Sequence, residues 1–315
     1  MTPSATPPTQ PVSLSGAQHE IAAGDYRATI VEVGAGLREL WYGVRPLTSS
    51  YDADEVPPGA DGQILIPWPN RVDHGRYVFA GDSYQLDITE PTRDNALHGL
   101  VRWTNWRTAL HEPDRVRLTY QLHGGPGYPF VLDLEVEYAL DATRGLTVRI
   151  SATNVGTRPA PYGNGAHPYL TAGTPTIDDC VATIPAARWL PTDHRYIPST
   201  STEHVDGTPY DLRTGRRLAG LRLDSAFTEL DRDGQGRAWA SLATADDGDQ
   251  VMLWADETYP WLQTYCGDEL PEDRRRTAFA VEPMSCPPNA FVTGEDLVVV
   301  APGETVTGTW GITAG

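Results

Sequence analysis

Apolar and polar residues alternate along several short segments of this chain. The clearest alternation separates five apolar residues with polar ones: Leu132, Leu134, Val136, Tyr138 and Leu140. A period of two sends successive side chains to opposite faces of a strand, so this segment is predicted to be a strand with one buried face. Residues 116–122 and 146–152 repeat the pattern and predict two more strands of the same kind.

Shorter apolar segments predict further strands at 28–33, 38–43, 76–80, 84–88, 238–243, 251–254, 261–266, 277–281, 296–300 and 305–312. Gly, Pro, Asp and Asn separate them at intervals of about ten residues, a spacing typical of antiparallel sandwiches. With 30 glycines and 27 prolines, long helices are hard to place. We predict an all-β fold, a large antiparallel β-sandwich with few short helices.

The chain shows no internal repeat and no linker that would divide it. Its 315 residues fit either two average domains or one large β-domain. The first fifteen residues are rich in Thr, Pro, Ser and Ala and contain no apolar run, unlike a signal peptide. We therefore predict a disordered tail over 1–17 and a single sandwich domain over 18–315.

Charge narrows the range of partners and chemistries. Lys plus Arg is 24 and Asp plus Glu is 42, giving a net charge of −18, which argues against nucleic-acid or anionic-membrane binding. Every basic residue is arginine, so a lysine Schiff base and a lysine-containing phosphate loop are excluded. Three widely spaced cysteines form no disulfide framework, and no segment reaches transmembrane length, so we expect a cytoplasmic protein.

His167 lies in a Gly/Pro-rich segment, residues 163–170. The two glycines before it can adopt backbone angles that a side chain forbids and can let a ligand approach the main chain. Pro168 fixes the direction in which the chain continues. A histidine held in this way suits a general acid or base, because its pKa is ordinarily near neutrality. Taken alone, such a residue is more often a loop histidine that makes one structural hydrogen bond and does nothing more.

Glu282 ends an apolar run, and prolines cluster just after it. A carboxylate at the end of a buried strand is partly desolvated, which raises its pKa and makes it a stronger base. The prolines would hold it rigidly, as a catalytic group requires. The alternative is a structural carboxylate.

Further polar and aromatic residues could bind a ligand. Trp68, between two prolines, offers a flat face for a sugar, and Arg71 offers a fork of donors to a hydroxyl or carboxylate. His98 precedes a glycine, and Trp103 and Trp106 just after it are expected in the core. Arg71 and His98 also have structural alternatives, as an ion-paired arginine and a hydrogen-bonded histidine.

Later in the chain, Asp224 could accept hydrogen bonds from sugar hydroxyls. Trp261, Gln263 and Tyr265 would share one face of a strand, and this polar row suits the wall of a ligand site better than a hydrocarbon core. A half-exposed edge strand is the alternative.

No metal site is expected. The other histidines considered lack metal-like spacing: His74, His111, His123, His194 and His204. Residues 231–234 faintly resemble a calcium loop, but no glutamate follows at the required place. Arg274–Arg276 are flanked by acids and fit a solvated loop, although they could contact an anionic sugar substituent.

Taken in order, these motifs resemble the aldose 1-epimerase (mutarotase) family over nearly the whole predicted domain. They are Asn70-Arg71, Leu97-His98-Gly99, His167-Pro168-Tyr169, Asp224-x-x-Phe227, Trp261-x-Gln263-x-Tyr265, and Glu282 followed by a Pro/Asn-Ala segment. No single motif is specific, but the whole set in the family's order is.

The resemblance implies a large antiparallel supersandwich that needs no cofactor or metal. It implies that His167 protonates the ring oxygen of a small sugar and that Glu282 takes the proton from the anomeric hydroxyl. It also implies that the sugar is held by Asn70, Arg71, His98, Asp224 and Gln263. Such chemistry needs one acid and one base, expected on opposite sides of a pocket, in a monomer or homodimer.

Two departures put a preference for galactose in doubt. This chain has His-Pro-Tyr-Leu where galactose mutarotases have a more polar His-x-Tyr-Phe-Asn, and Glu-Pro-Met where they usually have Glu-x-Gln. The acid and base positions are unaffected. The pattern is closer to a less-characterised bacterial branch of the family.

Three other functions remain open. A glycoside hydrolase would use two carboxylates about 5–10 Å apart, here Asp224 and Glu282, but would leave the histidines without a task. A sugar-binding protein would keep Trp68, Arg71 and Gln263 without needing the acid and base. An epimerase for a phosphorylated or otherwise anionic sugar would place extra arginines at the pocket, and the candidates are Arg71, Arg102 and Arg274–Arg276.

Overall fold

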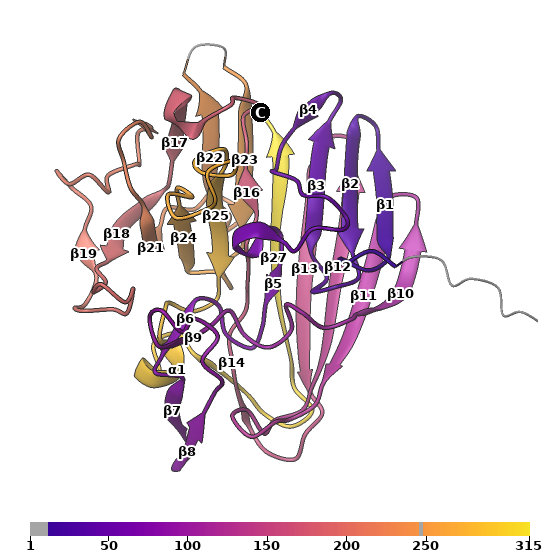
Figure 1. Cartoon of the computed structure of the whole chain (residues 1–315), viewed down its shortest axis with the longest axis vertical. Helices are drawn as coiled ribbons and strands as arrows, with labels where there is room; N and C mark the ends of the chain where they lie inside the picture. The colour runs from indigo at the N-terminus through magenta and orange to yellow at the C-terminus, as the bar shows by residue number, and fades with distance from the viewer. Residues whose placement is uncertain (1–11, 246–247) are drawn as a thin grey trace, which may run out of the picture.

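The computed structural model describes residues 12–245 and 248–315, and these form a β-sandwich (Figure 1). Every pairing between its named strands is antiparallel. Helical structure in the described ranges is limited to the short helix α1 (Ala290–Thr293) and two 3-10 turns, η1 (Pro58–Ala60) and η2 (Ile177–Asp179). The predicted all-β sandwich is confirmed.

One layer is a nine-stranded sheet. Its strands in spatial order are β10 (Arg107–Glu112), β11 (Arg115–Leu122), β12 (Leu132–Asp141), β13 (Gly145–Asn154), β27 (Thr305–Ala314), β23 (Gln250–Ala255), β22 (Ala238–Thr244), β17 (Cys180–Thr183) and β20 (Arg216–Arg217). The apolar residues of β12 are buried and alternate with more exposed ones, as the period of two predicts. Its register with β13 runs without interruption from Leu132↔Asn154 to Asp141↔Gly145.

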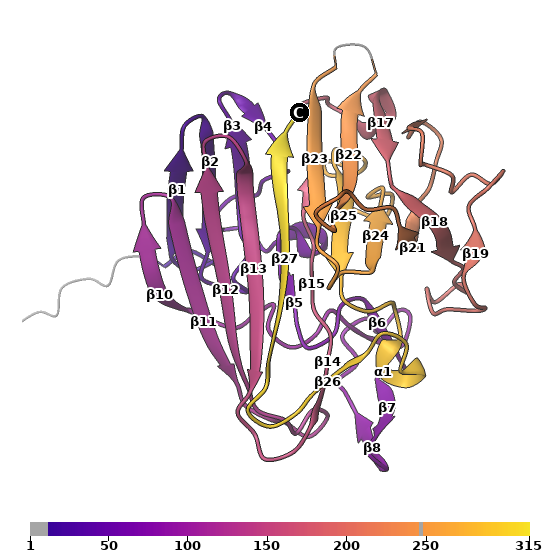
Figure 2. The same cartoon turned by 180° about the vertical axis from the view of Figure 1, so that it is seen from behind.

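Two sheets form the other layer. A four-stranded sheet contains β1 (Gln18–Ala23), β2 (Tyr26–Val31), β3 (Leu37–Tyr42) and β4 (Arg45–Pro46). An eight-stranded sheet runs through β19 (Glu203–His204), β18 (Ala186–Leu190), β21 (Asp224–Leu230), β24 (Trp261–Tyr265), β25 (Phe279–Met284), β15 (Gly165–Ala166) and β5 (Ile64–Leu65), with β16 (Tyr169–Leu170) also paired to β25. Figures 1 and 2 show the first sheet packed on β10–β13 and the second on the other half of the nine-stranded sheet.

Three small ribbons extend from the layers. They are β6 (Arg71–Asp73) with β9 (Asn95–Leu97), β7 (Arg76–Phe79) with β8 (Asp82–Gln85), and β14 (Ala160–Tyr162) with β26 (Val298–Val300). The β6–β9 ribbon matters most for function, because it carries Arg71 and leads directly into His98.

The core lies between the layers. One large cluster of buried apolar side chains spans it and includes Trp106, Tyr138 and Trp310. Tyr138 is completely buried, and its hydroxyl donates to the carbonyl of Ala35 at 2.6 Å, so the polar atom of this core residue is satisfied. Burial of apolar surface, at about 25 cal/mol per Å², is the main force that holds the two layers together.

The ordered chain begins before the predicted boundary at residue 18. Ser15 is buried, and both its amide and its hydroxyl donate to the carbonyl of Ala53. The amide of Ala17 donates to the carboxylate of Glu32 at 3.0 Å. The predicted disorder is therefore wrong for 12–17, because these long-range contacts leave no local sequence pattern. Residues 1–11 of the predicted tail lie outside the described ranges.

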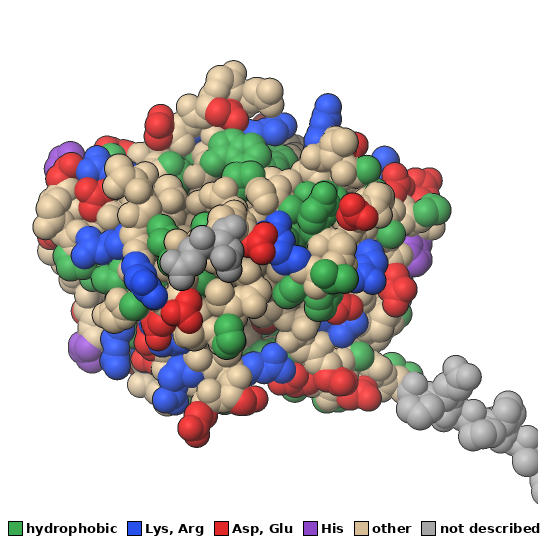
Figure 3. All heavy atoms as spheres, turned by 90° about the horizontal axis from the view of Figure 1, so that it is seen from above, with side chains coloured by type: hydrophobic (Ala, Val, Ile, Leu, Met, Phe, Trp, Pro, Cys, Tyr) green, Lys and Arg blue, Asp and Glu red, His purple; other side chains and the backbone are tan. Residues whose placement is uncertain are grey.

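Charged side chains of both signs share the surface. On the face seen in Figure 3, aspartates and glutamates are interspersed with arginines rather than gathered in a block. Several form exposed pairs, such as Arg217 with Asp179 at 3.3 Å. No helix within the described ranges combines the length and the apolar character needed to cross a bilayer.

Candidate active site

A cavity of about 370 Å³ opens on the eight-stranded sheet. Its walls come from β6, β16, β21, β24 and β25 and from the loops around residues 56–60, 98–103 and 269–270. Six of the seven predicted site residues line it: Asn70, Arg71, His98, His167, Asp224 and Glu282. The fold thus brings together residues as far apart in the sequence as Asn70 and Glu282.

Strand register places the polar groups on one face of the sheet. Gln263 on β24 pairs with Glu282 on β25, and Asp224 on β21 pairs with Tyr265 on β24. Residues directly opposite each other in an antiparallel pair share a face, and so do residues two apart on one strand. The four side chains therefore emerge together, while neighbours such as Leu262 belong to the main core on the other face.

His167 lies between β15 and β16, and its main chain is held on both sides. Its amide donates to the carbonyl of Gln63 at 3.1 Å, and its carbonyl accepts from the amide of Gly62 at 2.9 Å. The side chain is buried and stacks on Tyr169 with ring centroids 4.9 Å apart. This backbone pairing and stacking fix the direction in which the imidazole points.

The glycines before His167 serve a different purpose from the one predicted. Neither Gly163 nor Gly165 has a positive φ. Instead, a Cβ on Gly163 would lie 2.5 Å from Cys286 Sγ, and a Cβ on Gly165 would lie 2.9 Å from the carbonyl oxygen of Pro283. Both glycines are needed because the segment that contains β25 packs against them. The close approach of a ligand to this main chain, which we expected, is not the reason for these glycines.

His167 and Glu282 form the floor of the cavity. His167 Nε2 lies 3.3 Å from Glu282 Oε1, and both side chains are almost fully buried. The remaining atoms of the pair, His167 Nδ1 and Glu282 Oε2, are buried and have no hydrogen-bond partner in another described residue. The two groups lie side by side, whereas we expected them on opposite sides of the pocket.

Burial displaces the pKa values of the pair in opposite directions. Desolvation, helped by the negative charge of Asp224, raises the pKa of Glu282 well above its ordinary value. Desolvation, helped by the positive charges of Arg102 and Arg71, lowers the pKa of His167 to about 3. Burial thus disfavours the charged form of both groups, which favours a proton on Glu282 and none on His167.

His98 lies over the histidine of the pair. Its ring meets that of His167 edge to face, with centroids 5.4 Å apart. Its Nδ1 accepts a hydrogen bond of 3.1 Å from the amide of Asn70, so its proton is on Nε2 and this atom acts as a donor. Burial lowers the pKa of His98 well below its ordinary value, so the ring is neutral.

Asn70 shapes the turn that carries the next residue. Its φ is 54°, in the left-handed region that asparagine tolerates better than most residues. Its Oδ1 accepts from the amide of Arg71 at 3.0 Å, and its carbonyl accepts from the amide of His98 at 2.8 Å. Asn70 thus ties Arg71 to His98 across the β6–β9 ribbon.

Arg71 is buried and makes a two-pronged ion pair. Its Nε and Nη2 each donate to one oxygen of Glu90 at 2.9 Å, and its Nη1 lies 3.9 Å from Asp224 Oδ2. Its guanidinium also sits over the ring of Tyr196 at 4.7 Å. Although burial opposes it, the bonds to Glu90 raise the pKa of Arg71, which stays a fixed cation.

Asp224 and Gln263 act as a unit. Gln263 Nε2 donates to Asp224 Oδ1 at 2.5 Å. Gln263 is buried and does not itself line the cavity, so it holds Asp224 in place instead of forming the predicted wall. Burial raises the pKa of Asp224, and the nearby charge of Arg71 opposes that rise.

Three tryptophan predictions are wrong: Trp68 as a sugar platform, Trp103 as a core residue and Trp261 as part of a ligand wall. Trp68 is only 3% exposed and packs against Phe291 in the core, so it cannot serve as a sugar platform. Trp103, which was expected in the core, is 54% exposed and lines the cavity. Trp106 is in the core as expected. Trp261 is buried in a small apolar cluster, and its Nε1 donates to Asp296.

Several residues at the cavity were not predicted. Glu90 anchors Arg71, while Arg93 and Glu269 pair with each other at 2.8 Å at the rim. Tyr169 was noted only as part of a motif, although its ring supports His167. Glu90 follows no local pattern, and only its proximity in sequence to the Leu97-His98-Gly99 motif could have drawn attention to it.

Arg274 and Arg276 do not reach the cavity. Arg274 pairs with Glu55 at 2.8 Å, and Arg276 contacts both Asp178 and Asp268. Of the arginines considered from the sequence, Arg71 and Arg102 line the cavity.

The site contains three groups that can ligate a metal. One donor atom each from His98, His167 and Glu282 lies within 4.8 Å of the other two. Two imidazoles and one carboxylate suit zinc in type. The same atoms are those that an acid–base reaction on a sugar would use.

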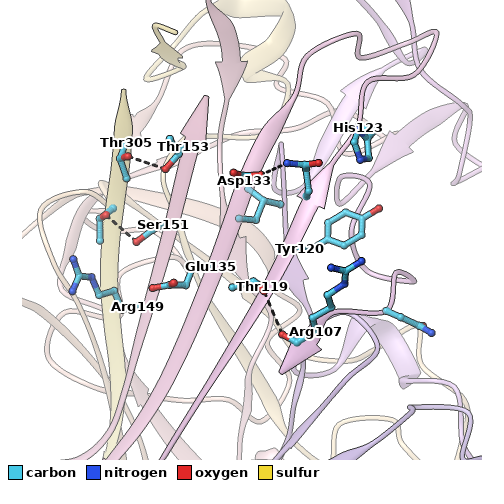
Figure 4. Close-up of a pocket in the computed structure, with 14 residues that line it drawn as sticks. Arg107, Thr119, Tyr120, His123, Asp133, Glu135, Arg149, Ser151, Thr153 and Thr305 are labelled. Atoms are coloured by element: carbon cyan, nitrogen blue, oxygen red, sulfur yellow. Dashed lines mark hydrogen bonds between the residues drawn. The ribbon is translucent and has the colours of Figure 1, made fainter. Parts of the chain in front are cut away.

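A larger hollow lies on the outer face of the nine-stranded sheet (Figure 4). It is a groove of about 780 Å³ over β10–β13 and β27. Its polar side chains satisfy one another, as in the bonds between Thr153 and Thr305 at 2.8 Å and between Gln121 and Asp133 at 2.7 Å. This groove therefore resembles a solvated sheet face more than a site built for a ligand.

Comparison with known proteins identifies the family. The family model described as aldose 1-epimerase matches residues 18–313. The uncharacterized protein YihR of Escherichia coli K12 is 38% identical over 92% of this chain and 91% of its own length. Mouse galactose mutarotase is 33% identical over 66% of this chain and 63% of its own length.

Solved structures share the fold. The GalM/aldose epimerase homologue from C. elegans superimposes with a TM-score of 0.85 at 19% identity, over 95% of this chain and 98% of that one. Galactose 1-epimerase from Lactobacillus acidophilus gives a TM-score of 0.76 at 19% identity, over 93% of each chain. Together with the match over nearly all of the sequence, these likenesses show that the chain belongs to the aldose 1-epimerase family.

Proposed function

We propose that this protein is an aldose 1-epimerase that interconverts the α and β anomers of a free aldose. The observation that carries the proposal is the contact of 3.3 Å between His167 Nε2 and Glu282 Oε1 at the floor of the cavity. The anomeric hydroxyl and the ring oxygen of an aldopyranose are bonded to the same carbon. Two groups that must act on these oxygens therefore have to lie close together, as these two do.

The reaction needs two proton transfers and one bond cleavage. A base removes the proton of the C1 hydroxyl, its electrons form the carbonyl, and the C1–ring oxygen bond breaks. The acid supplies the proton that the departing ring oxygen takes up. The open-chain aldehyde rotates about C1–C2, and the reverse steps close the ring on the other face with the roles exchanged. No proton is gained or lost overall, so a pair that holds one proton suffices.

The family resemblance makes His167 the acid and Glu282 the base for the opening step. This requires the proton to lie on His167, whereas burial favours it on Glu282. The two arrangements contain the same number of protons and differ only in where one proton lies across a short contact. A sugar hydroxyl that donates a hydrogen bond to Glu282 would favour the ionised carboxylate that the base must be.

The other residues of the cavity suit the recognition of hydroxyl groups. His98 offers an Nε2 donor, and Arg71 is a fixed cation that presents Nη1 to the cavity. Asp224 supplies an acceptor whose position Gln263 fixes. We propose that these groups, with Asn70 shaping the turn, orient the ring so that C1 lies over the pair.

A glycoside hydrolase and a binding protein fit the site less well. Asp224 is engaged by Gln263 and lies near Arg71, so its carboxylate is committed to bonds within the site. The immediate partner of Glu282 is His167, not a second carboxylate. A binding protein would have no use for a buried acid–base pair, which costs folding free energy because both groups lose water.

Polarimetry tests the proposal directly. Freshly dissolved α-D-glucose and α-D-galactose drift to an equilibrium rotation, and a catalytic amount of the enzyme must speed this drift without altering the endpoint. A preparation of Glu282→Gln serves as the control for contaminating activity. If neither these sugars nor charged aldoses respond, the epimerase proposal is rejected and a binding role takes its place.

A further inference from the structure

One arginine of the cavity differs from the other two in its partners. Three arginines line the cavity: Arg71, Arg93 and Arg102. Arg71 is paired with Glu90, and Arg93 with both Glu90 at 3.2 Å and Glu269 at 2.8 Å. Arg102 has no carboxylate within 4.0 Å anywhere in 12–245 or 248–315.

Most donors of Arg102 are unused. Nη2 donates to the carbonyl of Leu97 at 3.2 Å, while Nε is buried and has no partner among the described residues. A guanidinium has five N–H donors, and a partly buried one that is left unpaired loses solvation without compensation. Burial lowers the pKa of Arg102 to about 10, so the group is still charged at neutral pH.

The backbone holds Arg102 firmly in this position. The carbonyl of Arg102 accepts from Gln63 Nε2 at 3.0 Å, and the turn closes with a bond from the amide of Thr104 to the carbonyl of Val101. The guanidinium lies 5.4 Å from the ring of Trp103, which also lines the cavity. An unneutralised cation is thus presented to the cavity by a fixed segment, an arrangement typical of anion recognition.

We propose that the substrate is an aldose that carries a singly charged anionic group, which Arg102 binds. This proposal rests on the epimerase function proposed above and narrows its substrate. The carboxylate of a uronic acid, the sulfate group of a sugar sulfate and a free sulfonate share this chemistry, since each is a monoanion that presents two or more oxygens to a guanidinium. The anion supplies the negatively charged partner that Arg102 lacks among the described residues.

The charges of the cavity favour one negative charge over two. Arg71 and Arg93 are already neutralised by acids, so Arg102 is the single unmatched cation of the lining. The lining also contains four carboxyl groups: Glu90, Asp224, Glu269 and Glu282. A second negative charge would face these carboxyl groups in a protein whose net charge is −18. A dianionic phosphate is therefore disfavoured.

The reaction limits where the anion can lie. It cannot be on the anomeric oxygen, because a substituted anomeric oxygen has no proton for the base to remove. The exocyclic carbon can carry the charge and leave the ring hydroxyls free. Sugars substituted at that position are therefore the appropriate probes.

The test compares rates of anomer exchange by NMR at equilibrium for glucose, glucuronate, glucose 6-sulfate and glucose 6-phosphate. We expect kcat/KM for at least one of the two monoanions to exceed that for glucose by about 10- to 100-fold, the effect of a charge-assisted hydrogen bond. In Arg102→Met the ratio of monoanion to glucose should fall by a similar factor. Arg275→Met removes an exposed arginine outside the cavity and is the matched control, in which the ratio should not change.

The outcomes separate this proposal from the epimerase function. Turnover of glucose with no preference for a monoanion overturns the proposal and leaves the epimerase function standing. A preference for the phosphate over both monoanions overturns the charge argument. If no sugar is turned over, binding of glucuronate and of the 6-sulfate is measured by calorimetry. Binding that is lost in Arg102→Met supports the anion site without the epimerase function, and no binding overturns both.

Discussion

Gln263 lies directly opposite Glu282 in the pairing of β24 with β25, and it holds Asp224 on the next strand through a hydrogen bond of 2.5 Å. Glu282, the proposed base, and the residue that positions a neighbouring carboxylate are thus set by the same strand register. A slip of one residue would turn every side chain of β25 to the other face of the sheet. The geometry of the site is therefore specified by the same pairing that builds the fold.

The acid–base pair should be indispensable. We expect His167→Asn and Glu282→Gln each to lower kcat by about 10²–10⁴-fold, because each removes one of the two proton transfers. NMR exchange measures the rate, and circular dichroism checks the fold. Exposed His123→Asn and Glu112→Gln are matched controls that should act like the parent protein. Near-normal rates in either site variant would show that the assigned roles are wrong.

Glu282 should reduce stability at neutral pH. Its pKa is raised on folding, so between 4.5 and the raised value the folded protein binds more protons than the unfolded chain, and its free energy of unfolding falls as pH rises. Glu282→Gln removes this penalty. The melting temperature of the variant should exceed that of the parent by an amount that grows from pH 5 to pH 8. A constant difference over this range would contradict the raised pKa.

His167 contributes with the opposite sign. Its pKa is lowered on folding, so the unfolded chain binds more protons between about pH 3 and 6.5, and stability is lost as pH falls through that window. Between pH 4.5 and 6.5 the two groups change the free energy of unfolding in opposite directions as pH rises. The comparison of Glu282→Gln with the parent avoids this complication, because His167 is present in both.

The rate should fall at alkaline pH, when the proton shared by the pair is lost. The negative charge of Asp224 is one cause of the raised pKa of Glu282. Asp224→Asn should therefore shift the alkaline limb of kcat/KM to lower pH, whatever it does to the maximum rate. The full pH profile is the measurement. An unchanged limb would mean that another group controls the loss of activity.

Breaking the buried pair of Arg71 should cost more than breaking an exposed one. Glu90→Gln leaves a buried cation without its two-pronged partner, and we expect it to destabilise the protein by about 2 kcal/mol or more. It should also raise KM, since Arg71 loses its fixed position. Asp179→Asn breaks the exposed pair with Arg217 and should change the free energy of unfolding by less than about 1 kcal/mol. Urea denaturation of both variants gives the comparison, and equal effects would contradict the burial argument.

The parts of the fold that sequence could predict are those with a local signal. The alternation along β12 determines which residues face the core, and the same holds for β11 and β13. His167 and Glu282 could be singled out from the sequence because of their immediate neighbours. His167 lies in a Gly/Pro-rich loop, and Glu282 ends an apolar run. Local patterns of this kind can be recognised without knowing which distant residues pack against them.

The errors concern residues whose surroundings come from distant segments. Trp68 and Trp103 lie in similar turn-rich stretches, yet Phe291 packs against the first, whereas the second is 54% exposed within the described ranges. Glu90 has a role only because Arg71 lies across from it in space. The contacts of Ser15 with Ala53 are equally long-range. Burial and pairing of loop residues depend on tertiary structure, which composition and periodicity do not report.

The position of β27 constrains how the protein can be made. This strand, residues 305–314, lies between β13 and β23 and joins the two halves of the nine-stranded sheet. During synthesis, β10–β13 can form a meander early, but the sheet cannot close until these last-ordered residues leave the ribosome. The half-formed sheet has two unpaired edges in the meantime, at β13 and β23, and unpaired edges invite association with other chains. The nine-stranded sheet can therefore become continuous only after residues 305–314 have been made, however early its other strands fold.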